Sequence, residues 1–401
     1  MLSAFICVSS FAEIQNLVDD IAGRDPFNSG VWGIKAVTAS GKVLADHNSG
    51  VRMLPASNVK LLSTALVLDN FGPDYRFKTA LSSPASVENG VLDGDLYIVG
   101  SGDPSLGLNG PVTTIFSQWK NILSSNGIKK VNGRIIADHR CLGIFPSNEY
   151  WQVGDVRCGD GLELRGLNFR RNVRDPEHIF TRTFVGVPSP VDSCAQAFRN
   201  YLIDNGIQVS GGTASDSSDG IVPSDSLQTI GTTSSDRLSE LVRHTNFTSD
   251  NFYAEAFMNA ARRGRSVKET FKAAGFDFTG CDLVDGCGLS RQDFVTPAFF
   301  CDFLLGVAAK PYFNAYLNSL PQPGSGTLAA RLPNADKTVK QRVHMKSGSL
   351  NGVRCFSGYI LPSSSDGEII MFSILTNNMN GNGKMVLAAI DQMIEALARE
   401  N

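Results

Sequence analysis

The sequence predicts an α/β protein of the α+β kind, in which a domain built on an antiparallel sheet is interrupted by a β-rich inserted domain. The chain has 401 residues, which is more than one domain of ordinary size contains. Strand patterns occur near both ends, whereas residues 76–231 consist of short β-rich pieces between Gly, Ser, Pro and Asp turns. We therefore expect a discontinuous domain over 13–75 and 232–401, with 76–231 inserted into it.

Composition excludes several classes of protein. An apolar content of 42% and a charged content of 19% are typical of a globular protein with a normal core. The net charge of −3 argues against a nucleic-acid partner, because such proteins usually carry a basic surface. No apolar run reaches the roughly 20 residues that a transmembrane helix needs. The oligomeric state stays open.

Residues 1–12 are apolar and uncharged, and they end in Ser10-Phe11-Ala12, which is similar to a signal-peptide cleavage site. This segment is a possible signal-peptide remnant, which would indicate an exported protein in a periplasmic or extracytoplasmic location. A basic stretch at the start is missing, so an ordinary N-terminal segment is the alternative.

The chain contains eight cysteines, and seven would remain if Cys7 left with a signal peptide. An odd number implies at least one free thiol or an intermolecular bond. Cys281 and Cys287 flank a glycine-containing loop and could pair. Apolar neighbours around Cys301 and Cys355 indicate buried thiols.

The segment before residue 76 predicts a hairpin followed by a helix. Residues 31–37 are rich in β-formers, a turn follows, and residues 43–45 begin the return strand. Residues 58–71 carry a broad apolar stripe and end at Gly72-Pro73, a typical helix stop.

The remaining elements follow from the same patterns. The insert is expected to hold strands at 96–99 and 134–137 and a helix at 114–123. After it we expect helices at 235–241, 249–262 and 386–398 and strands at 355–360 and 369–376. This order predicts that the two ends of the chain share one sheet.

The first motif with chemistry is the pair Ser57 and Lys60, three residues apart at the start of the predicted helix. Residues i and i+3 of a helix lie on one face, so a lysine base could activate the serine hydroxyl. Such a lysine needs a lowered pKa, for which Lys346 is the candidate second cation. Ser117 and Lys120 repeat the spacing inside another predicted helix. A lone pair of this kind is usually a chance surface feature.

A second motif runs from Ser249 to Asn251. Ser249 could pass a proton between the base and the leaving nitrogen, and Asn251 could bind a substrate amide. The alternative is a helix N-cap at Ser249 or Asp250, and the two interpretations are compatible.

The third motif is Lys346-Ser347-Gly348 on a predicted strand edge. A lysine beside a hydroxyl forms a carboxylate site, and Gly348 leaves room for a substrate along the edge. The backbone N–H groups of Ser57 and Ser349 could form an oxyanion hole. The alternative is a solvated strand with a turn.

The sequence contains no motif for other common kinds of catalytic, metal or nucleotide-binding site. The sequence has no G-x-S-x-G elbow and no H-E-x-x-H, and Gly100-Ser101-Gly102 lacks the third glycine of a dinucleotide loop. The five histidines form no spaced cluster. We expect neither a metal nor a cofactor.

The three motifs together are the known signature of class A β-lactamases and penicillin-binding proteins. The chain further resembles the class C low-molecular-mass penicillin-binding proteins, the D-alanyl-D-alanine carboxypeptidase/endopeptidases. The resemblance rests on the amino-acid sequences of these segments: 55–62, 72–77, 100–106, 249–255, 285–291, 320–321 and 324–331.

This resemblance implies a penicillin-recognition α/β sandwich with a five-stranded antiparallel sheet. It also implies an enzyme that hydrolyses peptidoglycan stem peptides through an acyl-enzyme, and that penicillin inhibits by covalent reaction. It implies Ser57 as nucleophile, Lys60 as base, and Ser249 with Asn251 as relay and amide binder. Lys346, with Ser347, would anchor the substrate carboxylate.

The chain departs from the family pattern in several respects. Ser347 replaces threonine, Cys287 replaces serine, the insert is shorter than in large family members, and the N-terminus is a poor signal for export. A β-lactamase, an esterase or a D-amino-acid amidase on the same fold remains an alternative. A non-catalytic peptidoglycan-binding protein is a second one, but it would not need all of the catalytic side chains.

Overall fold

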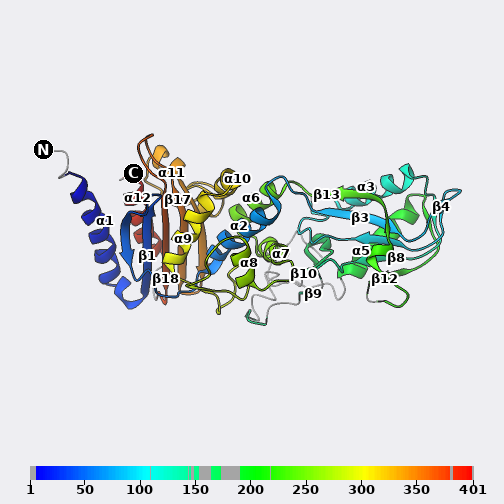
Figure 1. Cartoon of the computed structure of the whole chain (residues 1–401), viewed down its shortest axis with the longest axis horizontal. Coiled ribbons are helices and arrows are strands. Elements are labelled where there is room, and N and C mark those ends of the chain that lie inside the picture. Colours follow the sequence, from blue (N-terminus) through cyan, green and yellow to red (C-terminus); the bar gives the residue numbers. More distant parts are fainter. Residues whose placement is uncertain are drawn as a thin grey trace. The chain divides into compact units, whose positions relative to one another are not determined.

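The computed structural model describes residues 6–108, 110–142, 144–145, 149–152, 164–172, 190–216, 218–379 and 383–399. The chain divides into two compact units, which we describe separately (Figure 1). Unit 1 contains Met1–Pro73 and Ser239–Asn401, and unit 2 contains Asp74–Leu238.

Unit 1 is built on an antiparallel sheet that joins both ends of the chain. Its strand order among the described residues is β16 (Val343–Leu350), β17 (Val353–Ile360), β18 (Ile370–Asn377), β1 (Val31–Thr38) and β2 (Val43–His47). β1 pairs with β18 so that Val31 lies opposite Asn377 and Thr38 opposite Ile370. The predicted hairpin and the predicted sharing of one sheet by the two ends are both confirmed.

Helices cover this sheet, which explains why every residue of β18 is buried. α1 (Ile6–Gly23) packs on β2 and on α12 (Gly383–Arg399), which contacts β17. α9 (Pro297–Ala308) packs on β1 and β18. α2 (Val59–Phe71) packs along α7 (Asn251–Arg262). The result is the α/β sandwich that the sequence predicts.

The other elements of unit 1 are short. They are η1 (Phe27–Ser29), η2 (Ala56–Asn58), α6 (Leu238–Thr248), α8 (Val267–Ala273), β14 (Cys281–Asp282), β15 (Phe294–Val295), α10 (Phe313–Ser319), η6 (Gly326–Leu328) and α11 (Lys337–Arg342). No helix in the described part of the chain is both long and apolar enough to cross a membrane.

Unit 2 is built on a mixed sheet. Its strand order, for the residues described, is β12 (Thr213–Ser215), β8 (Ile135–Asp138), β6 (Leu96–Val99), β3 (Lys78–Ser83) and β13 (Gln228–Ser234). α3 (Val112–Ser125) and α5 (Pro190–Asp204) contribute the buried aromatic side chains Phe116, Trp119 and Phe198 to its core. α5 was not predicted from the sequence.

Smaller elements complete unit 2. They are β4 (Val87–Glu88), β5 (Val91–Leu92), β7 (Lys130–Val131), β9 (Ile144–Phe145), β10 (Leu164–Arg165), η3 (Phe169–Asn172), β11 (Gln208–Val209) and η5 (Ser224–Ser226).

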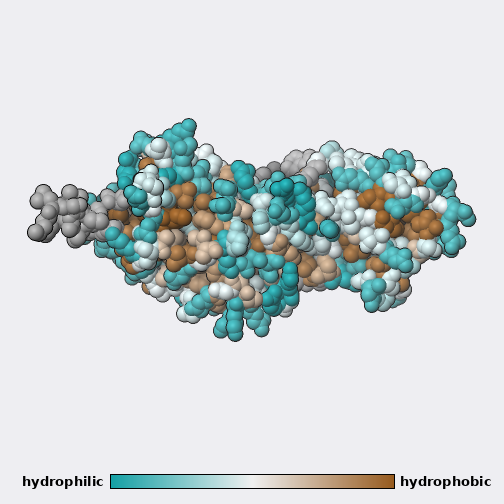
Figure 2. Space-filling model, turned by 45° about the horizontal axis from the view of Figure 1, so that its top comes forward, coloured by the Kyte–Doolittle hydropathy of each residue, from teal (hydrophilic) through white to brown (hydrophobic). Residues whose placement is uncertain are grey.

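On the face that Figure 2 shows, hydrophilic and apolar residues are interspersed, and apolar residues gather in places on each unit. The large hydrophobic residues that are exposed, among those described, are Val43, Val51, Val87, Tyr150, Ile203 and Met385.

The cysteines correct one expectation. Cys281 and Cys287 are both free, buried thiols, so the expected disulfide bond between them is wrong. Cys301 and Cys355 are buried, as predicted. The side chain of Cys7 and the whole of Cys158 lie outside the described residues.

Candidate active site

Ser57 lies in the short turn η2, directly before α2, and is partly exposed. Two glycines allow backbone to pack against this turn. A Cβ on Gly288, which has φ +82°, would lie 1.8 Å from the Ala56 carbonyl oxygen. A Cβ on Gly348 would lie 2.8 Å from the Pro55 carbonyl oxygen. The serine is therefore held between the loop that contains Gly288 and strand β16.

Lys60 lies in the first turn of α2 and is completely buried. Its Nζ lies 3.0 Å from Ser57 Oγ, which is the contact that the spacing of the two residues predicts. The same Nζ donates to Asn251 Oδ1 at 2.6 Å and to the Cys287 carbonyl oxygen at 2.7 Å. The ammonium thus meets three acceptors, and one of them is the serine hydroxyl.

The second motif combines two local roles. Asp250 is the N-cap of α7, and its side chain accepts a hydrogen bond from the Tyr253 N–H. Ser249 precedes the cap with φ +61°, so the N-cap alternative applies to Asp250 and not to Ser249. Ser249 Oγ instead accepts from Lys346 Nζ at 2.9 Å.

Lys346 lies on β16 and is fully buried, like Lys60. Burial, and then the charge of Lys60, lowers the pKa of Lys346 well below its ordinary value. Burial also lowers the pKa of Lys60, although nearby carboxylates such as Asp285 and Asp250 oppose the shift. Since the uncharged form is favoured by loss of water, Lys60 can accept a proton nearer neutral pH than an exposed lysine. Burial, rather than the expected second cation, is the main cause.

The rim of the site carries hydroxyl groups. Ser347 directly follows Lys346 on β16, and its Oγ lies 2.9 Å from Thr327 Oγ1 of η6. Lys346 Nζ also donates to the Ser347 carbonyl oxygen at 2.7 Å. Ser349 is exposed on the same strand. Thr327 was not predicted as a site residue, although its segment carries part of the family resemblance.

The loop that supplies the Cys287 carbonyl is fixed by two carboxylates. Asp285 accepts hydrogen bonds from the backbone N–H groups of Cys287, Gly288, Leu289 and Ser290, at 2.6–3.1 Å. Glu255 of α7 accepts from the Gly286 N–H at 2.7 Å. Sequence reasoning assigned no role to Glu255 or Asp285.

Glu255, Asp285 and Cys287 place ligand atoms within 4.8 Å of one another, but this donor set does not suit a metal ion. The oxygens of Asp285 are occupied by backbone N–H groups. Burial, followed by Asp285, raises the pKa of Glu255 to about 8, and burial raises the pKa of the Cys287 thiol well above its usual range. Both groups are therefore protonated at neutral pH, with the Lys60 ammonium beside them.

The second serine–lysine pair lies elsewhere. Ser117 and Lys120 are in the interior of α3, in unit 2, and not at the start of a helix. The structure therefore joins the three motifs around Ser57.

Comparison with known proteins decides the family. The family described as the D-Ala-D-Ala carboxypeptidase 3 (S13) family matches residues 14–177 and 179–400. The chain belongs to this family. The resemblance read from the motifs is confirmed, and the chain is thus one of the serine-type D-Ala-D-Ala carboxypeptidases.

Relatives and solved structures agree with this membership. The D-alanyl-D-alanine carboxypeptidase of Actinomadura sp. (strain R39) is 24% identical, over 92% of this chain and 82% of the relative. DacB of Haemophilus influenzae is 22% identical, over 93% of this chain and 90% of its own.

The fold is shared with solved structures. Penicillin-binding protein 4 (dacB) from Haemophilus influenzae superposes with a TM-score of 0.76 at 21% identity, over 96% of this chain and 98% of that one. Bd3459, a predatory peptidoglycan endopeptidase from Bdellovibrio bacteriovorus, gives a TM-score of 0.59 at 16% identity, over 93% and 92% of the two chains.

Proposed function

We propose that this S13 carboxypeptidase removes the terminal D-alanine of peptidoglycan stem peptides through an acyl-enzyme on Ser57. One observation carries the assignment of the nucleophile. Ser57 Oγ lies 3.0 Å from the Nζ of Lys60, a buried lysine whose pKa burial lowers. A hydroxyl at a helix start beside such a lysine is an activated nucleophile.

In the first step, Ser57 Oγ attacks the carbonyl carbon of the penultimate D-alanine while its proton passes to Lys60 Nζ. The tetrahedral oxyanion is bound by the backbone N–H groups of Ser57 and Ser349. The C–N bond then breaks, and a proton supplied through Ser249, which Lys346 contacts, reaches the leaving amine. Water hydrolyses the resulting ester and restores Ser57.

The substrate is held by groups around this centre. Asn251 Oδ1 is occupied by Lys60, so its Nδ2 hydrogens are directed to the amide carbonyl of the substrate. The hydroxyls of Ser347 and Thr327 bind the terminal carboxylate, and the charge of Lys346 lies behind them. Gly348 keeps the strand edge open along the substrate.

β-Lactams fit the same contacts, because they combine a reactive amide with a carboxylate. One structure of the Haemophilus influenzae relative is complexed with a β-lactam, and Bd3459 has been described acylated by penicillin G. For this chain we propose covalent capture at Ser57 in the same way. Its substrate lies outside the cytoplasmic membrane, so we also propose an exported, periplasmic or extracytoplasmic protein.

The test is the release of D-alanine from a peptide that ends in D-Ala-D-Ala. The wild type is expected to release it, Ser57→Ala to lose the activity, and Ser117→Ala to keep it. A Ser57→Ala protein that releases D-alanine at the wild-type rate would reject the proposal. Equal loss in the Ser117→Ala control would also reject it.

A further inference from the structure

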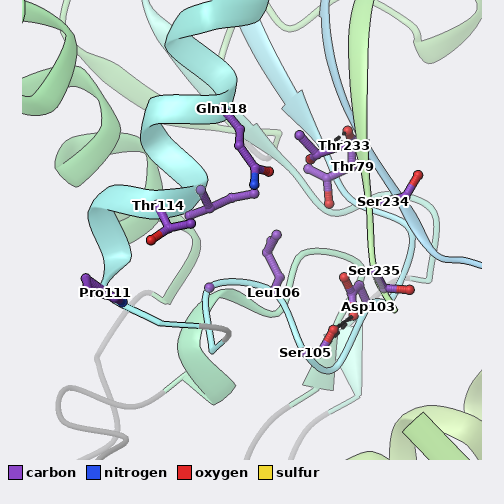
Figure 3. A pocket seen from close by; sticks show the side chains of 12 residues that line it. Thr79, Asp103, Ser105, Leu106, Pro111, Thr114, Gln118, Thr233, Ser234 and Ser235 are labelled. Atoms are coloured by element: carbon purple, nitrogen blue, oxygen red, sulfur yellow. Dashed lines mark hydrogen bonds between the residues drawn. The ribbon is translucent and has the colours of Figure 1, made fainter. Parts of the chain in front are cut away.

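A polar cavity of about 90 Å³ lies within unit 2, and none of the residues that line it belongs to the proposed mechanism. It is bounded by the loop 102–107, by α3 and by the end of β13. The volume is far more than the roughly 10–15 Å³ that one water molecule needs. Figure 3 shows Asp103, Ser105 and Ser235 at one end and Thr79 with Thr233 at another, with the Leu106 side chain between them.

Asp103 is the decisive group in this cavity. It is 5% exposed and is one of the residues that line the cavity. Oδ1 accepts from the N–H and the Oγ of Ser105, at 2.8 and 2.6 Å. Among the described residues, Oδ2 has no hydrogen-bond partner, and no basic side chain forms an ion pair with Asp103. A buried carboxylate left in this state is costly unless a donor completes it.

The charge of Asp103 persists at neutral pH. Burial, opposed by the hydrogen bonds of Ser105 and increased by Asp236, raises the pKa of this carboxyl to about 6. At pH 7 most of the side chain is therefore ionised. The cavity offers a negative charge and no positive charge of its own in the described residues.

The other end of the cavity offers neutral polar groups. Thr79 is 2% exposed, and its hydroxyl has no hydrogen-bond partner in the part of the chain that the structure describes. Thr233 Oγ1 accepts from Trp119 Nε1 at 3.0 Å, and the Gln118 amide projects from α3. Leu106 and Ile115 supply apolar contact between the two ends.

We propose that this cavity is a binding site for a small molecule with a primary ammonium group at one end and a hydroxyl or amide at the other. The ammonium donates to Asp103 Oδ2, a short aliphatic part packs on Leu106, and the second polar group meets Thr79 and Gln118. An ammonium suits the site because it brings three donors and a compensating charge. A divalent cation suits it less, because one carboxylate is available.

The test is calorimetric titration of the full chain with 4-aminobutan-1-ol and with butane-1,4-diol, which differ in the ammonium group. The wild type should bind the amine at least tenfold more tightly than the diol. Asp103→Asn keeps the shape and the Ser105 contact, and should weaken amine binding by about 10- to 100-fold. Asp225→Asn, an exposed acid of η5 that does not line the cavity, is the matched control and should bind as the wild type does.

Two further measurements keep the proposal falsifiable if Asp103→Asn folds poorly. Thr79→Val, which leaves the Asp103 carboxylate in place, should weaken the binding of the amine severalfold. Amine binding by the wild type should also weaken between pH 7.5 and pH 5, because Asp103 becomes protonated. Acylation of Ser57 by penicillin should be unchanged in Asp103→Asn and Thr79→Val. This measurement separates a loss of amine binding in the cavity from a failure of the proposed catalytic site.

The proposal is overturned if the wild type binds neither compound, or binds the diol as tightly as the amine. It is also overturned if Asp225→Asn weakens binding as much as Asp103→Asn does, or if affinity is equal at the two pH values.

Discussion

Lys60 combines two requirements that usually conflict. Its amine must be free to take a proton from Ser57, and burial favours that form by lowering the pKa. Once protonated, the ammonium needs acceptors, which Asn251 Oδ1 and the Cys287 carbonyl supply at 2.6 and 2.7 Å. The residue is therefore prepared for both states of the proton transfer.

Replacing this lysine tests its role directly. Lys60→Ala should slow acylation by a fluorescent penicillin by roughly 10²–10⁴-fold, because general base catalysis contributes about that much. Lys120→Ala, in the second serine–lysine pair, is the matched control and should react at the wild-type rate. Unchanged kinetics in Lys60→Ala, with an intact fold by circular dichroism, would move the base role to another residue.

The proposed binding of the substrate's terminal carboxylate leads to a separate prediction. A peptide ending in D-Ala-D-Ala should be cleaved with a kcat/KM about 10–150-fold higher than its C-terminal amide, since the amide loses a charge-assisted hydrogen bond. Ser347→Ala and Lys346→Ala should reduce this difference, whereas Lys337→Ala, at the exposed start of α11, should preserve it. Equal cleavage of acid and amide by the wild type would favour the amidase or esterase alternative.

The residues of the site differ in how well their roles can be predicted from the sequence. The contact between Ser57 and Lys60 follows from helix geometry over three residues, so spacing predicts it. Thr327 and Glu255 lie in segments that carry the family resemblance, but neither belongs to the three motifs, so the motifs alone assign them no role. Asp285 acts on four backbone N–H groups of its own loop, which only the folded turn reveals.

At the scale of elements, the loop 285–290 and helix α7 act together on Lys60. Asp285 folds the loop, Glu255 holds it to α7 through Gly286, and the Cys287 carbonyl meets the lysine. Glu255 is 9% exposed and has a pKa of about 8, so it is neutral in the folded protein at pH 7.

This raised pKa predicts a dependence of stability on pH. In the unfolded chain Glu255 ionises near pH 4.5, whereas in the folded protein it holds its proton up to about pH 8. The folded state is thus progressively disfavoured as the pH rises from 4.5 to 8. Relative to the wild type, Glu255→Gln should gain free energy of unfolding over that interval, measured by urea denaturation.

The matched control for this experiment is Glu13→Gln, an exposed acid on α1 in the same unit. Its difference from the wild type should stay constant with pH. A constant or falling difference for Glu255→Gln would contradict the assignment of a buried, protonated glutamate.

Periodic patterns predicted most elements around the site. The hairpin at β1 and β2, helix α2 and strands β17 and β18 all have apolar positions at the expected spacing. α1 was missed because its first residues resemble a leader, although Ile14, Val18 and Ile21 form a buried helical stripe. α5 was missed because its mean hydropathy is low.

At the scale of the whole molecule, the sequence of unit 2 interrupts that of unit 1. The central strands β18 and β1 come from opposite ends of the sequence, and Ser57 precedes unit 2 while Ser249 and Lys346 follow it. The site therefore forms only when both parts of unit 1 have folded together. Family membership and the five-strand order agree with this arrangement for the described residues.

The central claim is that Ser57 is the nucleophile of this assembly. The most direct measurement is incubation of the full chain with fluorescent penicillin, followed by proteolysis and mass mapping of the labelled peptide. The label is predicted on the peptide that contains Ser57, with one label per chain, and absent from the peptide that contains Ser117. A label on Ser117 or on any other residue, with Ser57 unmodified, would contradict the account.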